Sequence, residues 1–136
     1  MNQIPNKLMP QTKLTRKQRV GLLIAAVVVL LGLLTGKKLP VLSVSSTSRA
    51  FGTLLGAEIT RRFGDTLAED TYRVRCRGGA GQSFGAFAPS GLTLELEGDC
   101  NDGLGKGLSG GKLVLYPPKD STFDPGENII VGNVAL

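Results

Sequence analysis

Three segments of this chain alternate apolar and polar residues in the way that a half-buried β-strand does. They are Thr71–Gly78 (TYRVRCRG), Gly91–Gly98 (GLTLELEG) and Gly111–Pro118 (GKLVLYPP). Each segment begins twenty residues after the one before it, so the apolar positions fall in register. The positions that we expect to share interior columns are Val74, Leu94 and Val114, followed by Cys76, Leu96 and Tyr116. The pattern therefore predicts three strands that repeat one structural unit.

Glycine recurs at fixed offsets between these segments. The turn residues that we expect to be structural are Gly78, Gly81 and Gly85 in the first repeat and Gly98, Asn101 and Gly105 in the second. Asn is the natural substitute for Gly at the middle position if that position needs a positive φ angle. A period near twenty residues is typical of stacked units that bury a face only against their neighbours. The sequence thus predicts an all-β fold, a parallel β-helix, over these residues.

Charged side chains occupy the other face of the first two strands. The twenty-residue shift places Arg75 beside Glu95 and Arg77 beside Glu97, and opposite charges on adjacent strands favour this register. In the third segment, Leu113 and Leu115 replace charged residues at the positions that we assign to the outer face. We therefore expect the outer face of the third strand to be a covered surface.

One short helix is predicted before the repeats. Ala50–Phe63 has apolar residues near helical spacing and charged residues on the opposite side. Ser46, Thr47 or Ser48 can serve as its N-cap, because a short side-chain oxygen accepts a hydrogen bond from the first turn. We expect this helix to flank the open end of the stack, since the terminal face of a solenoid needs a cover.

Two segments are predicted to lack regular structure. Residues 37–48 are interpreted as a linker, because Pro40 is followed by a Ser/Thr cluster. Pro117–Glu127 is rich in Pro, Asp and Ser, and we expect it to be a loop that interrupts the third turn. Asn128–Val131 is then predicted to begin another strand, so that the repeat domain over residues 49–136 is incomplete.

The N-terminal part differs from the repeats in charge and hydropathy. Residues 1–38 carry seven basic residues and no acidic ones, whereas residues 39–136 carry nine basic and eleven acidic residues. Residues 1–19 form a basic arm, and residues 20–36 are an uncharged, almost wholly aliphatic run. As a helix this run is about 25 Å long, at the short end for crossing a hydrocarbon core of about 30 Å.

We interpret residues 20–36 as a transmembrane helix that anchors the protein to a membrane. A buried core helix fits poorly, because the run has no polar face and a small domain could hardly cover all its sides. A cleaved signal peptide is the rival, but no small-x-small cleavage pattern follows the run. If the N-terminal segment is instead a misassigned start, the protein is expected to be cytoplasmic.

The composition excludes several chemistries. The chain has no histidine and two cysteines, Cys76 and Cys100, which excludes His-dependent triads, His metal sites and closed four-cysteine sites. The register places Cys76 on a strand and Cys100 in a turn, so a disulfide between them is not expected. Nucleic-acid surfaces cluster basic residues on the folded domain, whereas the excess here lies in the N-terminal arm. We therefore expect no nucleic-acid partner.

Two further patterns have both a chemical and a structural interpretation. Gly105–Gly110 matches G-x-G-x-x-G, but a dinucleotide site needs a helix after it, and Lys112–Tyr116 is predicted to be a strand. Glu95 and Glu97 form a carboxylate pair that could perform acid–base chemistry, although arginine neighbours would keep both ionised. We favour the structural interpretation and predict no catalytic, cofactor-binding or metal-binding residue.

Four stretches resemble the C-terminal domain of the glutamate synthase large subunit. They are Arg49–Gly56, Ala80–Phe87, Leu94–Asn101 and Gly105–Gly111. The resemblance covers about residues 49–136 and implies a right-handed parallel β-helix with a G-x-x-G-x-x-x-G repeat. In that oxidoreductase family the whole enzyme uses glutamine, 2-oxoglutarate, FMN and an iron–sulfur cluster, and this domain is a spacer without catalytic residues. The resemblance therefore implies no cofactor in this chain itself.

These observations lead to a first hypothesis and two rivals. The first is a non-catalytic structural domain related to glutamate synthase, either a fragment or a membrane-anchored stand-alone copy. Its expected partners are other domains or subunits of a glutamate synthase-like assembly, and the membrane through residues 20–36. The alternative is a membrane-tethered protein-binding scaffold, unrelated to glutamate synthesis, that binds a partner through Leu113 and Leu115. A stand-alone enzyme that binds a nucleotide at the glycine loops is the third hypothesis.

Overall fold

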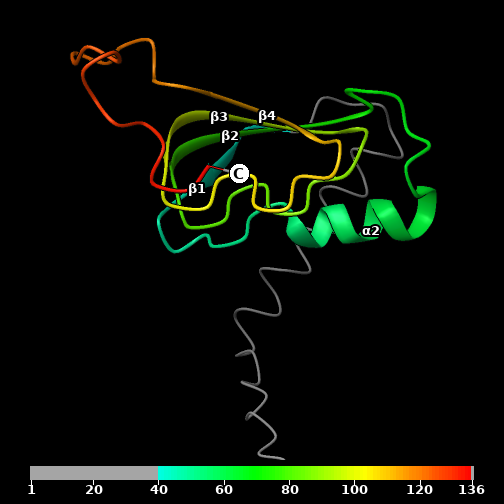
Figure 1. The fold of residues 1–136 in the computed structure, drawn as a ribbon. Helices are drawn as coiled ribbons and strands as arrows, with labels where there is room; N and C mark the ends of the chain where they lie inside the picture. Colours follow the sequence, from blue (N-terminus) through cyan, green and yellow to red (C-terminus); the bar gives the residue numbers. More distant parts are fainter. Residues whose placement is uncertain (1–39, 136) are drawn as a thin grey trace, which may run out of the picture.

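The computed structural model describes residues 40–135 and contains one four-stranded parallel sheet and one short helix (Figure 1). The predicted basic arm at 1–19 and membrane helix at 20–36 lie outside the described residues. Among residues 40–135, no helix is both long and apolar enough to cross a membrane. The elements, in chain order, are β1 (Leu42–Val44), α2 (Thr53–Phe63), β2 (Tyr72–Ala80), β3 (Leu92–Cys100) and β4 (Lys112–Tyr116).

The strands follow one another across the sheet in the order β1-β2-β3-β4, and every neighbouring pair is parallel. Strands β1, β2 and β3 are each followed by a turn segment on the other side of the core, and each of these strands with its turn forms one coil. Figure 1 shows these stepped turn segments following one another on the side of the stack opposite the sheet. The predicted parallel stacking of the repeats is therefore confirmed.

The predicted twenty-residue register holds between β2 and β3 but not between β3 and β4. Val74 pairs with Leu94, but Leu94 then pairs with Leu113, and Val114 lies opposite Glu95. The reason is the link before β4. Pro89 and Ser109 occupy matching positions, yet Thr93 matches Lys112, so the second link is one residue shorter. A one-residue slip reverses the face of every following side chain.

The predicted orientation of the side chains in the third strand was therefore wrong. Leu113 and Leu115 extend the interior columns of Leu94 and Leu96 and pack against the core, whereas Val114 and Tyr116 belong to the outer face. The outer face of the third strand thus lacks the leucine patch that we expected to be covered, and the alternative scaffold hypothesis loses its proposed binding residues.

The core lies between the sheet and the turn segments. Its central side chains are buried almost completely and come from matching positions of successive coils: Val74, Cys76, Leu92, Leu94, Leu96 and Phe84. The ring of Phe84 stacks on that of Phe51 in the preceding coil, with 5.5 Å between the ring centroids. Burying these side chains removes apolar surface from water, which is the main stabilising contribution to the stack.

The turn segments share a backbone pattern that glycine spacing alone did not predict. Left-handed residues alternate along the turn at Gly103, Gly105 and Gly107, with φ angles of 77°, 65° and 65°. The preceding coil repeats the pattern at Ser83, Gly85 and Phe87, with φ angles of 62°, 70° and 58°. Ala50 and Gly52 repeat it once more in the coil before that, with φ angles of 50° and 93°.

Backbone hydrogen bonds join these matching turns. The Gly105 N–H donates to the Phe84 carbonyl at 2.9 Å, and the Gly85 N–H donates to the Phe51 carbonyl at 2.9 Å. Because such bonds recur from coil to coil, the polar backbone of the turns is satisfied within the stack. The turn before α2 is therefore the first member of the series.

This placement corrects the predicted start of the helix. Helix α2 begins at Thr53 instead of Ala50, and its N-cap is Gly52, which makes no side-chain capping bond. The serines and threonine proposed as caps lie in a tight turn after β1, where the Ser48 N–H donates to the Ser45 carbonyl at 2.7 Å. The cap prediction failed because the repeated left-handed turn occupies the residues between that cluster and α2.

The structure also differs from the prediction in the linker before the helix and in the last predicted strand. The predicted linker at 37–48 contains β1, which pairs with Cys76–Gly78 of β2. The side chains of Leu42 and Val44 in β1 pack in the core. Residues 117–127 form the predicted loop. The strand expected at Asn128–Val131 is reduced to one bridge between Val131 and Cys100.

Candidate functional site

The outer face of the sheet carries a series of ion pairs between successive coils. Arg73 lies 3.0 Å from Glu95, Arg75 lies 3.4 Å from the same carboxylate, and Arg77 lies 2.8 Å from Glu97. The predicted neighbours of Glu95 and Glu97 are therefore confirmed, and Arg73 is an additional partner. We call these five residues the outer ladder.

Glu95 is the most buried member of the outer ladder, with 9% of its surface exposed. The Tyr116 hydroxyl donates a hydrogen bond to its carboxylate at 2.7 Å. This bond lowers the pKa of Glu95 below its ordinary value, and the charges of Arg73 and Arg75 lower it further. Glu95 is thus held as a carboxylate near neutral pH, which does not suit it to act as a general acid.

A second polar cluster lies at the start of the strands. The hydroxyl of buried Thr93 donates to Asp70 at 2.6 Å, and the Lys112 ammonium group lies 2.9 Å from Asp70 and 2.5 Å from Glu69. The bond from Thr93, followed by that from Lys112, lowers the pKa of Asp70. This cluster joins β3 and β4 to the segment before β2.

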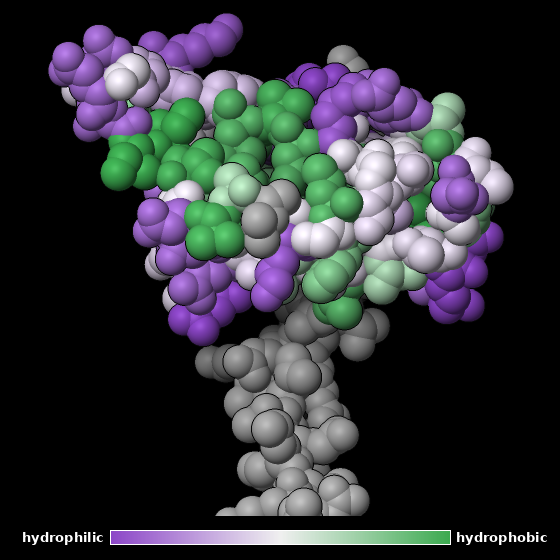
Figure 2. All heavy atoms as spheres, in the orientation of Figure 1, coloured by the Kyte–Doolittle hydropathy of each residue, from purple (hydrophilic) through white to green (hydrophobic). Residues whose placement is uncertain are grey.

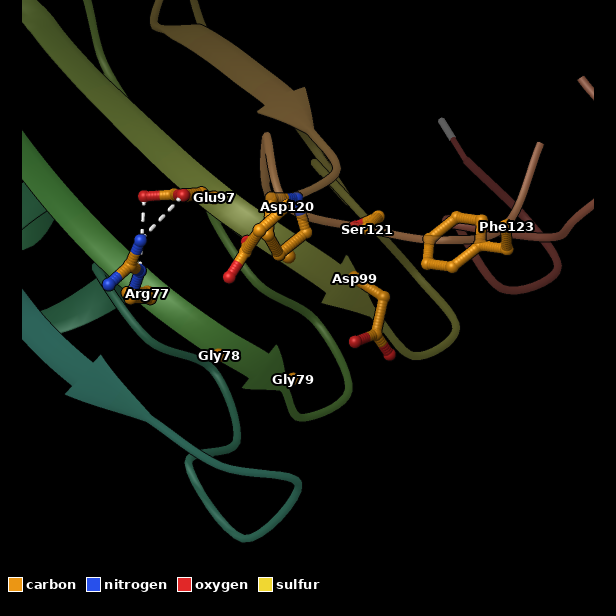
Figure 3. A pocket seen from close by; sticks show the side chains of 10 residues that line it. Arg77, Gly78, Gly79, Glu97, Asp99, Asp120, Ser121 and Phe123 are labelled. Carbon is orange, nitrogen blue, oxygen red and sulfur yellow. Dashed lines mark hydrogen bonds and ion pairs between the residues drawn. The ribbon is translucent and has the colours of Figure 1, made fainter. Parts of the chain in front are cut away.

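A shallow hollow of about 370 Å³ lies at the other end of the ladder (Figure 3). Its floor includes Gly78, Gly79 and Gly98, and the Arg77–Glu97 pair forms one side. The loop after β4 borders it with Pro118, Asp120, Ser121 and Phe123. A Cβ atom on Gly78 would meet the Val44 carbonyl, and one on Gly98 would meet the Gly78 carbonyl. Only glycine therefore fits at these two positions, which lie within β2 and β3 and not in the turns where we predicted them.

The other predicted turn residues lie where the chain changes direction, but for different reasons. Gly85 and Gly105 have left-handed backbones. Neither Gly81 nor Asn101 has a positive φ angle, so the conformational reason that we gave for the middle position was wrong. At Gly81 the constraint is contact, because a Cβ atom there would lie 2.5 Å from the Ser46 carbonyl oxygen.

The structure does not give the G-x-G-x-x-G segment the context of a dinucleotide site. Strand β4 follows Gly105–Gly110, as predicted, whereas the phosphate-binding turn of such a site leads into a helix. The Gly105 N–H is already bonded to the Phe84 carbonyl. Across the described part of the chain, no three His, Cys, Asp or Glu side chains are close enough to hold a metal ion.

Both cysteines are free and buried. Burial raises the pKa of the Cys76 thiol to about 12, so this group stays protonated at neutral pH and is a poor nucleophile. Cys100 pairs with Ala80, as expected from the register, but it ends β3 instead of lying in a turn.

The structure thus brings the predicted charged residues together, and adds partners that the sequence did not identify. Tyr116 was predicted to point into the core, and the shortened link places it over Glu95 instead. Asp70 was missed because it precedes the alternating segment, where its local sequence has no periodic pattern. Together these groups form a neutralised, hydrogen-bonded surface that joins coil to coil.

These features define a class of protein: a stack of parallel β-coils whose turns have left-handed residues at alternate positions, which in the turn after β3 form the G-x-G-x-G series Gly103, Gly105 and Gly107. Comparison with known families agrees. Residues 34–136 match the GXGXG motif family, and the chain belongs to this family.

Curated relatives carry the same domain within much longer chains. The chain is 54% identical over 94 residues to glutamate synthase (NADH) of Schizosaccharomyces pombe, covering 68% of this chain and 4% of that protein. It is 47% identical over 96 residues to the glutamate synthase (NADPH) large chain of Bacillus subtilis, covering 70% and 6%. It is 42% identical over 91 residues to ferredoxin-dependent glutamate synthase 2 of Synechocystis, covering 67% and 6%. The predicted relationship to the glutamate synthase large chain is therefore confirmed.

Proposed function

We propose that this chain is a non-catalytic structural domain, a right-handed parallel β-helix that supports neighbouring domains or subunits of a glutamate synthase-like assembly. The observation that carries the proposal is the outer ladder. Glu95 and Glu97 form ion pairs with arginines of β2, and Glu95 also accepts a hydrogen bond from Tyr116 of β4. These carboxylates therefore stabilise the stack and are not directed toward a substrate.

The packing of the coils supports the same role. Leu94 and Leu96 are fully buried, and the turn backbones bond to one another from coil to coil. Local opening of such a stack exposes several of these contacts at once, which makes it a rigid element. A rigid element of this kind suits a spacer that keeps other domains at a fixed separation.

The proposal includes the partners and cofactors expected from the family. We propose that the chain binds neither FMN nor an iron–sulfur cluster, and that these cofactors belong to other parts of a glutamate synthase-like assembly. We also propose no nucleic-acid partner, because residues 39–136 carry more acidic than basic residues.

Membrane attachment through residues 20–36 is a further part of the proposal. It is supported by the charge-free aliphatic run and by basic residues on both sides of it. Fractionation of cells that express the full-length chain tests it. Carbonate-resistant association with membranes is the expected result, and recovery in the soluble fraction would show that the segment is no anchor.

The catalytic part of the proposal is tested with the purified full-length chain in a mild detergent. We expect no hydrolysis of glutamine and no formation of glutamate from glutamine and 2-oxoglutarate with a reduced electron donor. Calorimetric titration with FMN, NAD(P) and ATP should give no binding heat. Turnover without added partners, or saturable binding of a nucleotide, would contradict the proposal.

A further inference from the structure

The outer ladder lacks an arginine at the last outward-facing carboxylate of β3. Arg77 is opposite Glu97, and two residues further along the same strands Gly79 is opposite Asp99. Among residues 40–135, the exposed Asp99 forms no ion pair. The repeat therefore ends in a carboxylate without the arginine that accompanies the carboxylates before it.

The fold gives no reason for glycine at position 79. Gly79 has no positive φ angle, and a Cβ atom there would meet only the Asp99 carboxylate, at 3.2 Å. A surface carboxylate can move aside, unlike the backbone carbonyls that exclude a larger residue at Gly78 and Gly98. The missing side chain instead leaves room outside the strands, since Gly79 and Asp99 both line the hollow.

An insertion in the repeat forms the other wall of the hollow. Leu96 lies seven residues before Gly103, which has a left-handed backbone. Its neighbour Leu115 lies nineteen residues before the left-handed Val134, and the Gly103 N–H donates to the carbonyl of the residue before Val134 at 3.0 Å. Most of the additional residues form the loop at 117–127. Figure 1 shows this loop projecting from the stack, and Figure 2 shows that its side chains are mostly hydrophilic. Insertions in repeat proteins lie on one face, which is often the binding face.

The charges around the hollow favour a cation. Its lining carries one positive side chain, Arg77, and three negative ones, Glu97, Asp99 and Asp120. Arg77 is bonded to Glu97, whereas neither aspartate has an ion-pair partner in the described part of the chain. In Figure 3 the carboxylates of Asp99, on β3, and Asp120, in the loop, point toward the glycine floor.

We infer that the hollow binds an arginine side chain of a neighbouring domain or subunit, which completes the outer ladder at Asp99. The inference rests on the proposed supporting function, because it names a contact through which the domain holds a neighbour. A guanidinium group is planar and always charged, and two of its N–H groups bond to one carboxylate side by side. The partly exposed ring of Phe123, at the border of the hollow, offers an aromatic surface to the same cation.

Peptide titration of the full-length chain in a mild nonionic detergent tests the inference. The probe is a capped glycine–arginine–glycine tripeptide. In the matched control peptide, citrulline replaces arginine, because it has nearly the same shape and no charge. We expect saturable shifts of the Gly79 and Gly98 amide NMR signals with the arginine peptide alone, at millimolar concentrations. Added salt should weaken this binding, since the hollow is open to solvent.

Four variants locate the binding on the chain. Asp99→Asn and Asp120→Asn should each raise the dissociation constant of the arginine peptide about tenfold. Asp65→Asn is the matched control and should leave it unchanged, because Asp65 is exposed and lies between α2 and the start of β2, whereas the hollow lies at the end of β2. Gly79→Arg supplies the missing arginine within the chain, so it should also weaken peptide binding at least about tenfold.

Several results would overturn the inference. They are equal shifts with the citrulline peptide, unchanged affinity in Asp99→Asn or Gly79→Arg, and equal loss in Asp65→Asn. The absence of shifts in the wild-type chain, as would occur if residues 1–39 filled the hollow, also overturns it. The proposed function fails through a different result, namely turnover or nucleotide binding by the chain without partners.

Discussion

Adding a single methyl group at Gly98 should strongly destabilise the chain, because it would enter the space between two coils. Gly98 has a φ angle of 147°, and its Cβ atom would meet the Gly78 carbonyl of the adjacent strand. A backbone atom cannot move aside as a flexible side chain can. We expect overpacking to cost about 1–3 kcal/mol and the backbone conformation about 1–2 kcal/mol more.

Two other glycines separate these contributions. Gly64 has a φ angle of 60°, and a Cβ atom there meets nothing within 4 Å, so Gly64→Ala should cost about 1–2 kcal/mol from conformation alone. Gly81 has no positive φ, but its Cβ would lie 2.5 Å from the Ser46 carbonyl oxygen. Gly81→Ala should therefore cost about 1–3 kcal/mol from contact alone.

The assay is urea unfolding of the full-length variants in one mild detergent, followed by circular dichroism. Gly98→Ala should reduce the free energy of unfolding by about 2–5 kcal/mol, roughly the sum of the conformational and overpacking costs. If Gly98→Ala were no more destabilising than Gly64→Ala, the close contact between the coils at this position would not exist.

Three further predictions concern the core, the outer ladder and the buried thiol. Leu94→Ala should lower the free energy of unfolding by about 2–5 kcal/mol, and a loss below about 1 kcal/mol would contradict the full burial of Leu94. Tyr116 and two arginines lower the pKa of Glu95 in the folded state. Ionised Glu95 therefore stabilises the fold at pH values above its unfolded-state pKa of about 4.3. This contribution is lost as the pH falls through the folded-state pKa. Glu95→Gln should therefore flatten the fall in stability on acidification, and an unchanged pH profile would refute the role of Glu95. Cys76 should react with iodoacetamide at neutral pH only after urea unfolding, because its thiol is buried and its pKa is about 12; rapid labelling of the folded chain would contradict that burial.

The repeat pattern predicted the centre of the fold because each strand uses the same alternation. Arg75 beside Glu95 and Val74 beside Leu94 follow from one shift applied to two similar segments. The third strand was misassigned because the link at Ser109–Lys112 is one residue shorter than its counterpart. The alternation within KLVLY puts polar Lys112 on the same face as Val114, which indicates the observed orientation, whereas the fixed twenty-residue period predicts the opposite one.

The turns show a different limit of sequence reasoning. Ser83 and Phe87 adopt left-handed backbones that their residue types disfavour, and only alignment with Gly103 and Gly107 would have revealed them. Strand β1 was missed because three residues give too short an alternation to be recognised. Both features depend on hydrogen bonds to a neighbouring coil, which no local pattern records.

The most direct test of the stacked coils is a methyl NOE experiment on the full-length chain in a mild detergent. Adjacent parallel strands lie about 4.8 Å apart, so Leu94 should show strong cross-peaks to Val74 on one side and to Leu113 on the other. Val114 should show none to Leu94 of comparable strength. Strong Leu94–Val114 cross-peaks, or no contact between Leu94 and Val74, would contradict the stack on which the proposed supporting role depends.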